Sequence, residues 1–150
     1  MIRFAPIRHD ARKYFPDMVN YFSSINEVEC VYLFGSYVRK DVTPLSDVDI
    51  AVYLSSRVSR DKYFDLRLRL YGEAMRLLRT EEVDVVLLNQ AGIQFAYEII
   101  LTGKILYERD QMNRITFETR TIDRYLDFKP VLLIQQEYFL QQIRRGEVFG

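Results

Sequence analysis

The most regular apolar pattern of this sequence lies between residues 60 and 79, and a short run rich in β-branched residues stands on each side of it. Apolar side chains recur there at intervals of three and four, which predicts an amphipathic helix. One face of this helix carries Tyr63, Leu66, Leu70, Ala74 and Leu77. The flanking runs, 48–54 and 83–88, have the length and composition of buried strands. A chain built in this way packs helices on a β-sheet.

The same alternation of helix and strand extends through the rest of the chain. The remaining elements that we expect are helices at about 10–25 and 92–101 and strands at 30–34 and 104–107. Pro16 begins or kinks the first helix, and Pro130 interrupts the helical C-terminal third. The predicted fold class is therefore α/β (α+β), with one small mixed β-sheet flanked by helices and a helical C-terminal extension.

Length and composition favour one domain. The chain has 150 residues, 49% of them apolar, and contains neither an internal repeat nor a Gly/Ser-rich linker. We expect a single domain over 1–150, with a core at about 1–108 and C-terminal helices at about 109–150. The 21 basic and 21 acidic residues cancel, which argues against a protein dedicated to direct nucleic-acid binding.

Several other classes of protein are disfavoured by the same sequence. No apolar run approaches the roughly 18 residues that span a bilayer, and the first residues lack the apolar core of a secretory signal. We therefore expect a cytoplasmic protein that does not bind membranes. Cys30 and His9 are the only residues of their types, so neither an internal disulfide nor a Cys/His metal site can form. The chemistry must rest on carboxylates, hydroxyls and arginines.

Three carboxylates fall within or beside apolar strands. Asp47 and Asp49 are two residues apart, so both are expected to project from one face of a strand, and Asp84 stands between valines of the next strand. Carboxylates at such positions are costly because they are desolvated and repel one another. A hard divalent cation removes this cost, and Mg²⁺ typically takes a few carboxylates together with substrate phosphates.

A phosphate-binding turn is predicted just before these acids. Gly35-Ser36 ends one strand and opens a short helix, where backbone N–H groups and the serine hydroxyl can cradle a phosphate. Arg39 follows one turn later and can reach the same anion with its forked donors. The residue pattern thus supplies both halves of a site for a metal-bound nucleotide.

Gly35-Ser36, ten further residues and Asp47-Val48-Asp49 resemble the Gly-Ser-X10-Asp-X-Asp signature of the polymerase-beta-like nucleotidyltransferases. More narrowly, the chain resembles the MntA-type minimal nucleotidyltransferases, antitoxins that are partners of HEPN-domain ribonuclease toxins. The resemblance covers nearly the whole chain. It includes the strand with Asp84 and the segments 101–107 and 125–128.

This resemblance implies an enzyme that transfers AMP from ATP to a tyrosine of the HEPN toxin, with pyrophosphate leaving. It implies that Asp47, Asp49 and Asp84 hold Mg²⁺, as two ions, and that Asp49 and Asp84 flank the attacking hydroxyl. Gly35, Ser36 and Arg39 would bind the nucleotide. The implied domain is a single minimal nucleotidyltransferase domain.

Two other functions remain open at the level of sequence. One is transfer of a nucleotide to a small hydroxylated molecule such as an aminoglycoside, although such enzymes usually carry a larger C-terminal domain. The other is an antitoxin that acts by occlusion without catalysis, against which the intact set of three acids argues.

Two further regions have a structural and a functional interpretation. Seven basic residues between Arg57 and Arg79 are interpreted as a solvated helix face. The C-terminal third carries more apolar side chains than a small sheet needs, so it either closes over the core or is exposed for a partner helix.

Overall fold

The computed structural model describes residues 10–39 and 47–146. The described residues form a four-stranded sheet with the strand order β3-β2-β1-β4. The strands are β1 (Val28–Phe34), β2 (Val48–Leu54), β3 (Val83–Leu87) and β4 (Lys104–Glu108). β1 pairs antiparallel with β2 and β4, whereas β2 and β3 are parallel. The predicted small mixed sheet is therefore confirmed.

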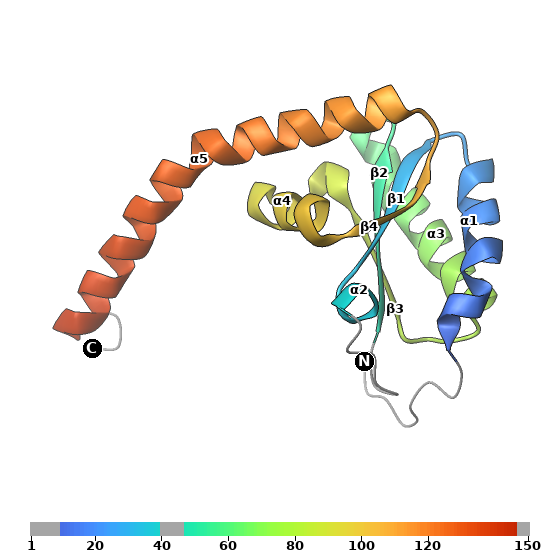
Figure 1. The fold of residues 1–150 in the computed structure, drawn as a ribbon, viewed down its shortest axis with the longest axis horizontal. Helices are drawn as coiled ribbons and strands as arrows, with labels where there is room; N and C mark the ends of the chain where they lie inside the picture. Colours follow the sequence, from blue (N-terminus) through green and yellow to red (C-terminus); the bar gives the residue numbers. More distant parts are fainter. Residues whose placement is uncertain (1–9, 40–46, 147–150) are drawn as a thin grey trace.

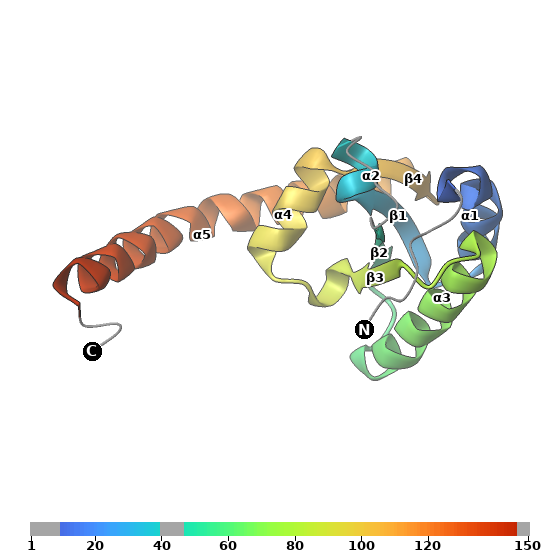
Figure 2. The ribbon, with the colours of Figure 1, turned by 90° about the horizontal axis from the view of Figure 1, so that it is seen from below.

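Helices cover both faces of this sheet. The α-helices are α1 (Phe15–Ser24), α2 (Ser36–Arg39), α3 (Tyr63–Leu78), α4 (Ile93–Thr102) and α5 (Gln111–Arg145). Short 3₁₀ turns stand at Ala11–Tyr14, Arg60–Lys62 and Leu88–Gln90. In Figures 1 and 2, α1 and α3 lie on one side of the sheet, and α4 and α5 lie on the other. The fold is the expected α/β class, with helices on both sides of one sheet.

The two faces of the sheet bury cores of different size because side chains alternate along each strand. The larger core lies under α1 and α3 and includes Met18, Phe22, Val31, Ile50, Val52, Leu70 and Leu78. The smaller core lies under α4 and the start of α5 and includes Cys30, Tyr32, Ala51, Ile99 and Phe117.

The element boundaries agree closely with the sequence predictions. α1 carries Pro16 in its first turn, where a missing N–H costs nothing, so the helix begins there and is not kinked. β2 spans the predicted 48–54. α3 follows a 3₁₀ turn and ends at Arg79, whose φ of 57° is the left-handed conformation common at helix ends.

The C-terminal prediction was wrong in one respect. Instead of separate helices interrupted near Pro130, the chain forms one helix of 35 residues that contains Pro130. An internal proline removes one backbone hydrogen bond and kinks a helix, and here the helix continues on both sides of it. Figure 1 shows α5 changing direction part-way along its length. No helix among the described residues has the length and apolarity needed to span a membrane.

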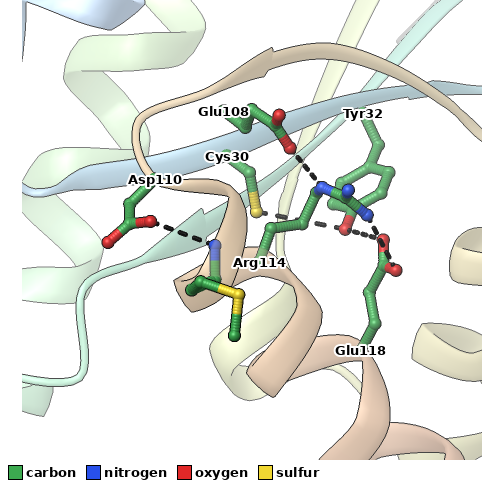
Figure 3. A network of polar contacts seen from close by, with 7 residues as sticks. Cys30, Tyr32, Glu108, Asp110, Arg114 and Glu118 are labelled. Atoms are coloured by element: carbon green, nitrogen blue, oxygen red, sulfur yellow. Dashed lines mark hydrogen bonds and ion pairs between the residues drawn. The ribbon is translucent and has the colours of Figure 1, made fainter.

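A polar network fixes the first turns of α5 to the sheet (Figure 3). Arg114 pairs with Glu108 at the end of β4, and it pairs with Glu118 one turn further along α5 at 3.0 Å. The hydroxyl of the buried Tyr32 in β1 donates to Oε1 of Glu118 at 2.7 Å. Asp110 caps α5 by accepting the N–H of Met112. The start of α5 is thus held by an ion pair with β4 and by a hydrogen bond from β1.

Candidate active site

Two of the predicted acids are direct neighbours across the sheet. Asp49 on β2 and Asp84 on β3 are register partners in the parallel pair. Paired residues on adjacent strands project from the same face, with backbones about 4.8 Å apart. Asp47 stands immediately before β2, at the same end of the sheet. The structure therefore brings Asp47, Asp49 and Asp84 to one end of two adjacent strands.

The turn after β1 lies directly against one of these carboxylates, that of Asp49. Gly35 has a φ of +75°, which favours glycine, and a Cβ added there would lie 2.1 Å from Oδ2 of Asp49. No other residue type fits this position without displacing the acid. Gly35 is therefore required both by the backbone conformation of the turn and by its contact with Asp49.

Ser36 and Arg39 lie next to each other on the short helix that follows. The carbonyl oxygen of Gly35 accepts the N–H groups of Val38 at 3.1 Å and Arg39 at 3.2 Å, which closes a single helical turn. Nη2 of Arg39 donates to Oγ of Ser36 at 3.4 Å. The turn, the hydroxyl and the guanidinium thus gather beside Asp49. The rest of the ten-residue connection to Asp47, like His9, falls outside the described residues.

Arg67 on α3 was not singled out by the sequence analysis, which grouped it with the solvated basic face. Its Nε donates to the carbonyl oxygen of Val85 at 2.8 Å, and its Nη2 lies 3.8 Å from Oδ1 of Asp84. The arginine therefore binds the backbone of β3, at the edge of the sheet, and partly offsets the negative charge of Asp84. Its place beside the apolar stripe, next to Leu66 and three residues before Leu70, is the signal that could have revealed it.

A pocket with a volume of about 380 Å³ lies against the same end of β3. Its acidic lining residues are Asp47, Glu81, Glu82 and Asp84, and Arg67 and Tyr71 come from α3. Among the described residues, four carboxylates and one guanidinium line this pocket. Carboxylates gathered in this way favour a bound cation.

The acids fit a divalent cation in chemistry and in backbone placement. Their donors are oxygen atoms only, which is the set that Mg²⁺ takes. Among residues 10–39 and 47–146, however, no three acidic, histidine or cysteine side chains converge into a ready metal group. Asp84 faces Arg67 and Asp49 lies against Gly35. Binding of one ion by all three carboxylates therefore requires their side chains to turn.

A comparison with protein families gives an independent result. The family model described as polymerase beta nucleotidyltransferase matches residues 17–112, which is more than half of the chain and contains every predicted site residue. Among curated proteins, the chain is 28% identical over 102 residues to the protein adenylyltransferase MntA of Shewanella oneidensis. This match covers 68% of the present chain and 69% of that protein.

Solved structures show the same fold. A toxin–antitoxin structure with AMP-PNP matches with a TM-score of 0.65 at 23% identity, over 88% of this chain and 97% of that chain. A complex of an MNT antitoxin with the tri-AMPylated HEPN toxin of Shewanella oneidensis matches with a TM-score of 0.63 at 21% identity. That match covers 90% of this chain and 99% of the other.

Proposed function

The chain belongs to the polymerase beta nucleotidyltransferase family, and from this premise we propose that it is a protein adenylyltransferase that acts as an antitoxin. It transfers AMP from ATP to a tyrosine hydroxyl of a cognate HEPN-domain ribonuclease toxin and thereby silences it. The observation that carries the proposal is the contact of the Gly35 turn with Asp49, whose register partner is Asp84.

The similar proteins support the same reaction. The curated relative is named a protein adenylyltransferase, one similar structure holds AMP-PNP, and another contains a toxin that carries AMP groups. We propose residues 1–150 as one minimal nucleotidyltransferase domain, with a catalytic core at about 1–108 and a C-terminal part at about 109–150. The proposed place of reaction is the cytoplasm, and the proposed cofactor is Mg²⁺, as two ions.

The residues of the site divide the work between binding and proton transfer. The hydroxyl of Ser36 and the guanidinium of Arg39 hold phosphate oxygens of ATP beside the Gly35 turn. Asp47, Asp49 and Asp84 would hold Mg²⁺, which supplies charge stabilisation of the attacking and leaving oxygens when it is bound. Arg67 lies beside Asp84 at the edge of β3.

The covalent step exchanges a phosphoanhydride bond of ATP for a phosphoester bond to tyrosine. The tyrosine oxygen forms a bond to the α-phosphorus of ATP as the bond to the pyrophosphate oxygen breaks. The phenol has a pKa of about 10, so its proton must leave during the attack. A carboxylate of the Asp49 and Asp84 pair accepts that proton.

The experiment that tests this function is an intact-mass measurement of the purified toxin after incubation with this protein, ATP and Mg²⁺. We expect a gain of one or more AMP units together with loss of ribonuclease activity. The variant Asp47→Asn with Asp49→Asn should keep its fold and transfer no AMP. Glu81→Gln, which also removes an acid of the same pocket, is the matched control and should transfer AMP normally.

Three outcomes contradict the proposal in different ways. Full activity of the Asp47/Asp49 double variant removes these acids from the mechanism. Inhibition of the toxin by tight binding without any change of mass identifies an antitoxin that acts by occlusion. Transfer of AMP to an aminoglycoside, with no transfer to the toxin, identifies an enzyme acting on small molecules.

A further inference from the structure

A second pocket, larger than the acidic one, lies at the other end of the sheet, and the proposed reaction does not use it. Its volume is about 630 Å³, and no described residue lines both pockets. It is formed by the start of β1, the end of β2 and the start of α5. In Figure 1 the start of α5 lies at the opposite end of the sheet from α2. Tyr53, which lines this pocket, is about 13 Å along β2 from Asp49.

This second pocket carries the opposite charge to the acidic one. Among the described residues, four basic and two acidic side chains line it. The basic ones are Arg57, Lys62, Arg109 and Arg120, and the acidic ones are Glu27 and Glu29. An excess of positive charge within a hollow surface attracts anions.

Three of these four basic side chains are not engaged by the protein itself. Arg109 is engaged, because its guanidinium donates to three backbone carbonyl oxygens between the end of α1 and the start of β1, at 2.9–3.1 Å. Within residues 10–39 and 47–146, by contrast, the side chains of Arg57, Lys62 and Arg120 form neither a hydrogen bond nor an ion pair. They come from the segment after β2 and from α5, and their donors are available to a ligand.

Two aromatic rings hold the shape of the pocket and add one more polar group. Tyr53 of β2 stacks on Phe117 of α5 with ring centroids 3.9 Å apart. The hydroxyl of Tyr53 has no hydrogen-bond partner in the described part of the chain. Burial raises the pKa of this phenol and the positive charge of Arg120 opposes the rise, so the guanidinium lies near the hydroxyl. The pocket thus places a neutral O–H donor beside an unpaired cation.

The acidic side chains stand where β1 begins. The carbonyl oxygen of Glu27 accepts the N–H of Ser55 at 2.7 Å, which holds the start of β1 beside the end of β2. Oε2 of Glu29 accepts a hydrogen bond from Nδ2 of Asn113 at 3.4 Å. Carboxylates repel an anionic group but accept hydrogen bonds from hydroxyls. A pocket lined by both signs of charge therefore fits a molecule that carries an anionic group and hydroxyl groups.

We propose that this pocket binds a small sugar phosphate, either free or as the ribose phosphate of a nucleotide. The terminal oxygens of a phosphate match the forked donors of Arg57 and Arg120 and the ammonium of Lys62, whereas a carboxylate offers only two oxygens. Glu27 and Glu29 accept the sugar hydroxyls. The volume of about 630 Å³ lies in the range of small-molecule sites. The pocket is separate from the catalytic acids, so the inference does not depend on the proposed function.

The test measures binding by calorimetry to the full-length chain with Ser36→Ala and Arg39→Gln, which removes the phosphate donors of the catalytic turn. Ribose 5-phosphate should bind this parent chain. Inorganic phosphate should bind at least about fivefold more weakly, because it lacks the hydroxyls, and ribose should not bind detectably. Addition of Arg57→Gln with Arg120→Gln should weaken the binding of ribose 5-phosphate by about tenfold or more.

Arg60→Gln with Arg124→Gln is the matched control. It removes the same two charges from the same two segments, but neither residue lines the pocket. The affinity should change by less than about twofold, because exposed charges at a distance are screened by salt. Thr116→Trp fills the pocket without a change of charge and should abolish binding. The melting temperature of every variant should stay near that of the parent chain, since the substituted side chains are exposed.

Each possible result has a defined meaning. Loss of binding in the Arg57/Arg120 and Thr116→Trp variants, with normal binding in the control, supports the inference. AMP that binds more tightly than ribose 5-phosphate, and is lost in the same variants, also supports it and identifies a nucleotide as the source. Equal affinity for the two identifies a free sugar phosphate.

Three results overturn the inference. The first is no binding of ribose 5-phosphate to the parent chain. The second is an equal loss in the control variant, which would show a general attraction by basic surface. The third is equal affinity for inorganic phosphate and ribose 5-phosphate, which would show an anion site without contacts to a sugar.

Discussion

Charged side chains gather at two places on this sheet, and the two places differ in how their charges are balanced. At the base of α5, Arg114 is only 14% exposed and pairs with both Glu108 and Glu118, and Tyr32 donates to the second carboxylate. At the end of β2 and β3 where the acids lie, Asp84 is 51% exposed and its Oδ1 is 3.8 Å from Nη2 of Arg67, which also lines the acidic pocket.

The difference separates a structural cluster from a binding site. A partly buried charge that is paired and hydrogen-bonded holds elements together, and removing one partner costs stability. Exposed carboxylates gathered at one place repel one another, and binding of a cation relieves this repulsion. Four predictions test this difference, and they are given from the largest expected effect to the smallest.

Among these four changes, removal of the charge of Asp84 should lower turnover most. Asp84→Asn keeps the shape of the side chain but cannot accept a proton, so we expect turnover to fall by roughly 100- to 1000-fold. The affinity for ATP should stay within about threefold, since Ser36 and Arg39 hold the phosphates. Single-turnover kinetics with the toxin and calorimetry with ATP measure the two quantities. Loss of ATP affinity with normal turnover would identify Asp84 as a binding residue instead of a proton acceptor.

Substitution of Gly35 should disturb the site through its contact with Asp49. Gly35→Ala places a Cβ against Oδ2 of Asp49 and strains a residue with a φ of +75°. We expect turnover to fall by about 10- to 100-fold and the free energy of unfolding to fall by about 1–2 kcal/mol.

Gly72→Ala is the matched control for this change. Gly72 lies in α3, and a Cβ there would meet no atom within 4 Å. Alanine should therefore stabilise the helix by about 0.5–1 kcal/mol and leave turnover unchanged. Equal losses of activity in the two variants would show that Gly35 acts only through general stability.

Disruption of the paired cluster should change stability without changing the affinity for ATP. Arg114→Met leaves Glu108 and Glu118 without their shared cation, and we expect the free energy of unfolding in urea to fall by about 2 kcal/mol. Arg76→Met breaks the exposed pair with Glu73 and should cost less than about 0.5 kcal/mol. A similar loss in both variants would mean that the α5 base contributes no more than a surface ion pair.

The thiol beside this cluster should be unreactive in the folded protein. Burial raises the pKa of Cys30 to about 12 from an ordinary value of 9.0, and the hydrogen bond with Tyr32 only partly opposes this. Iodoacetamide should therefore label Cys30 only in denaturant at neutral pH. Because the folded pKa is the higher one, the stability contribution of the thiol is complete below pH 9.0 and is lost as pH rises toward about 12. Rapid labelling of the native protein near neutral pH would show that this region opens.

Several features of the fold and the site could be predicted before the structure was known. The apolar stripe of α3 and the strand β2 follow from local periodicity, and local periodicity depends on residues close together in the chain. Pro16 begins α1, which is one of the two outcomes that its position allowed. The continuity of α5 through Pro130 was not predicted. The proline removes one backbone hydrogen bond, but the other hydrogen bonds of this 35-residue helix outweigh that loss.

Some side chains of the site could be identified from the sequence, and one could be identified only from the structure. Asp47, Asp49 and Asp84 were identified because acids within apolar strands are costly, and that cost is visible in the sequence. Arg67 was missed because its partners, Val85 and Asp84, become neighbours only when α3 packs beside β3. The assignment of Asp47, Asp49 and Asp84 as metal ligands and proton acceptors stays a prediction until the variants are measured.

The sequence by itself determined the order of helices and strands and the residue types of the acidic site, since both depend on short-range pattern and on the chemistry of single residues. Only the tertiary structure decided which charges are balanced. It paired Asp49 with Asp84 across the β2–β3 register and pressed Gly35 against Asp49. It also left the second half of α5 beyond the reach of the sheet. These relations join residues far apart in the chain, and electrostatic and apolar free energies depend on distance in space and on exposure to water.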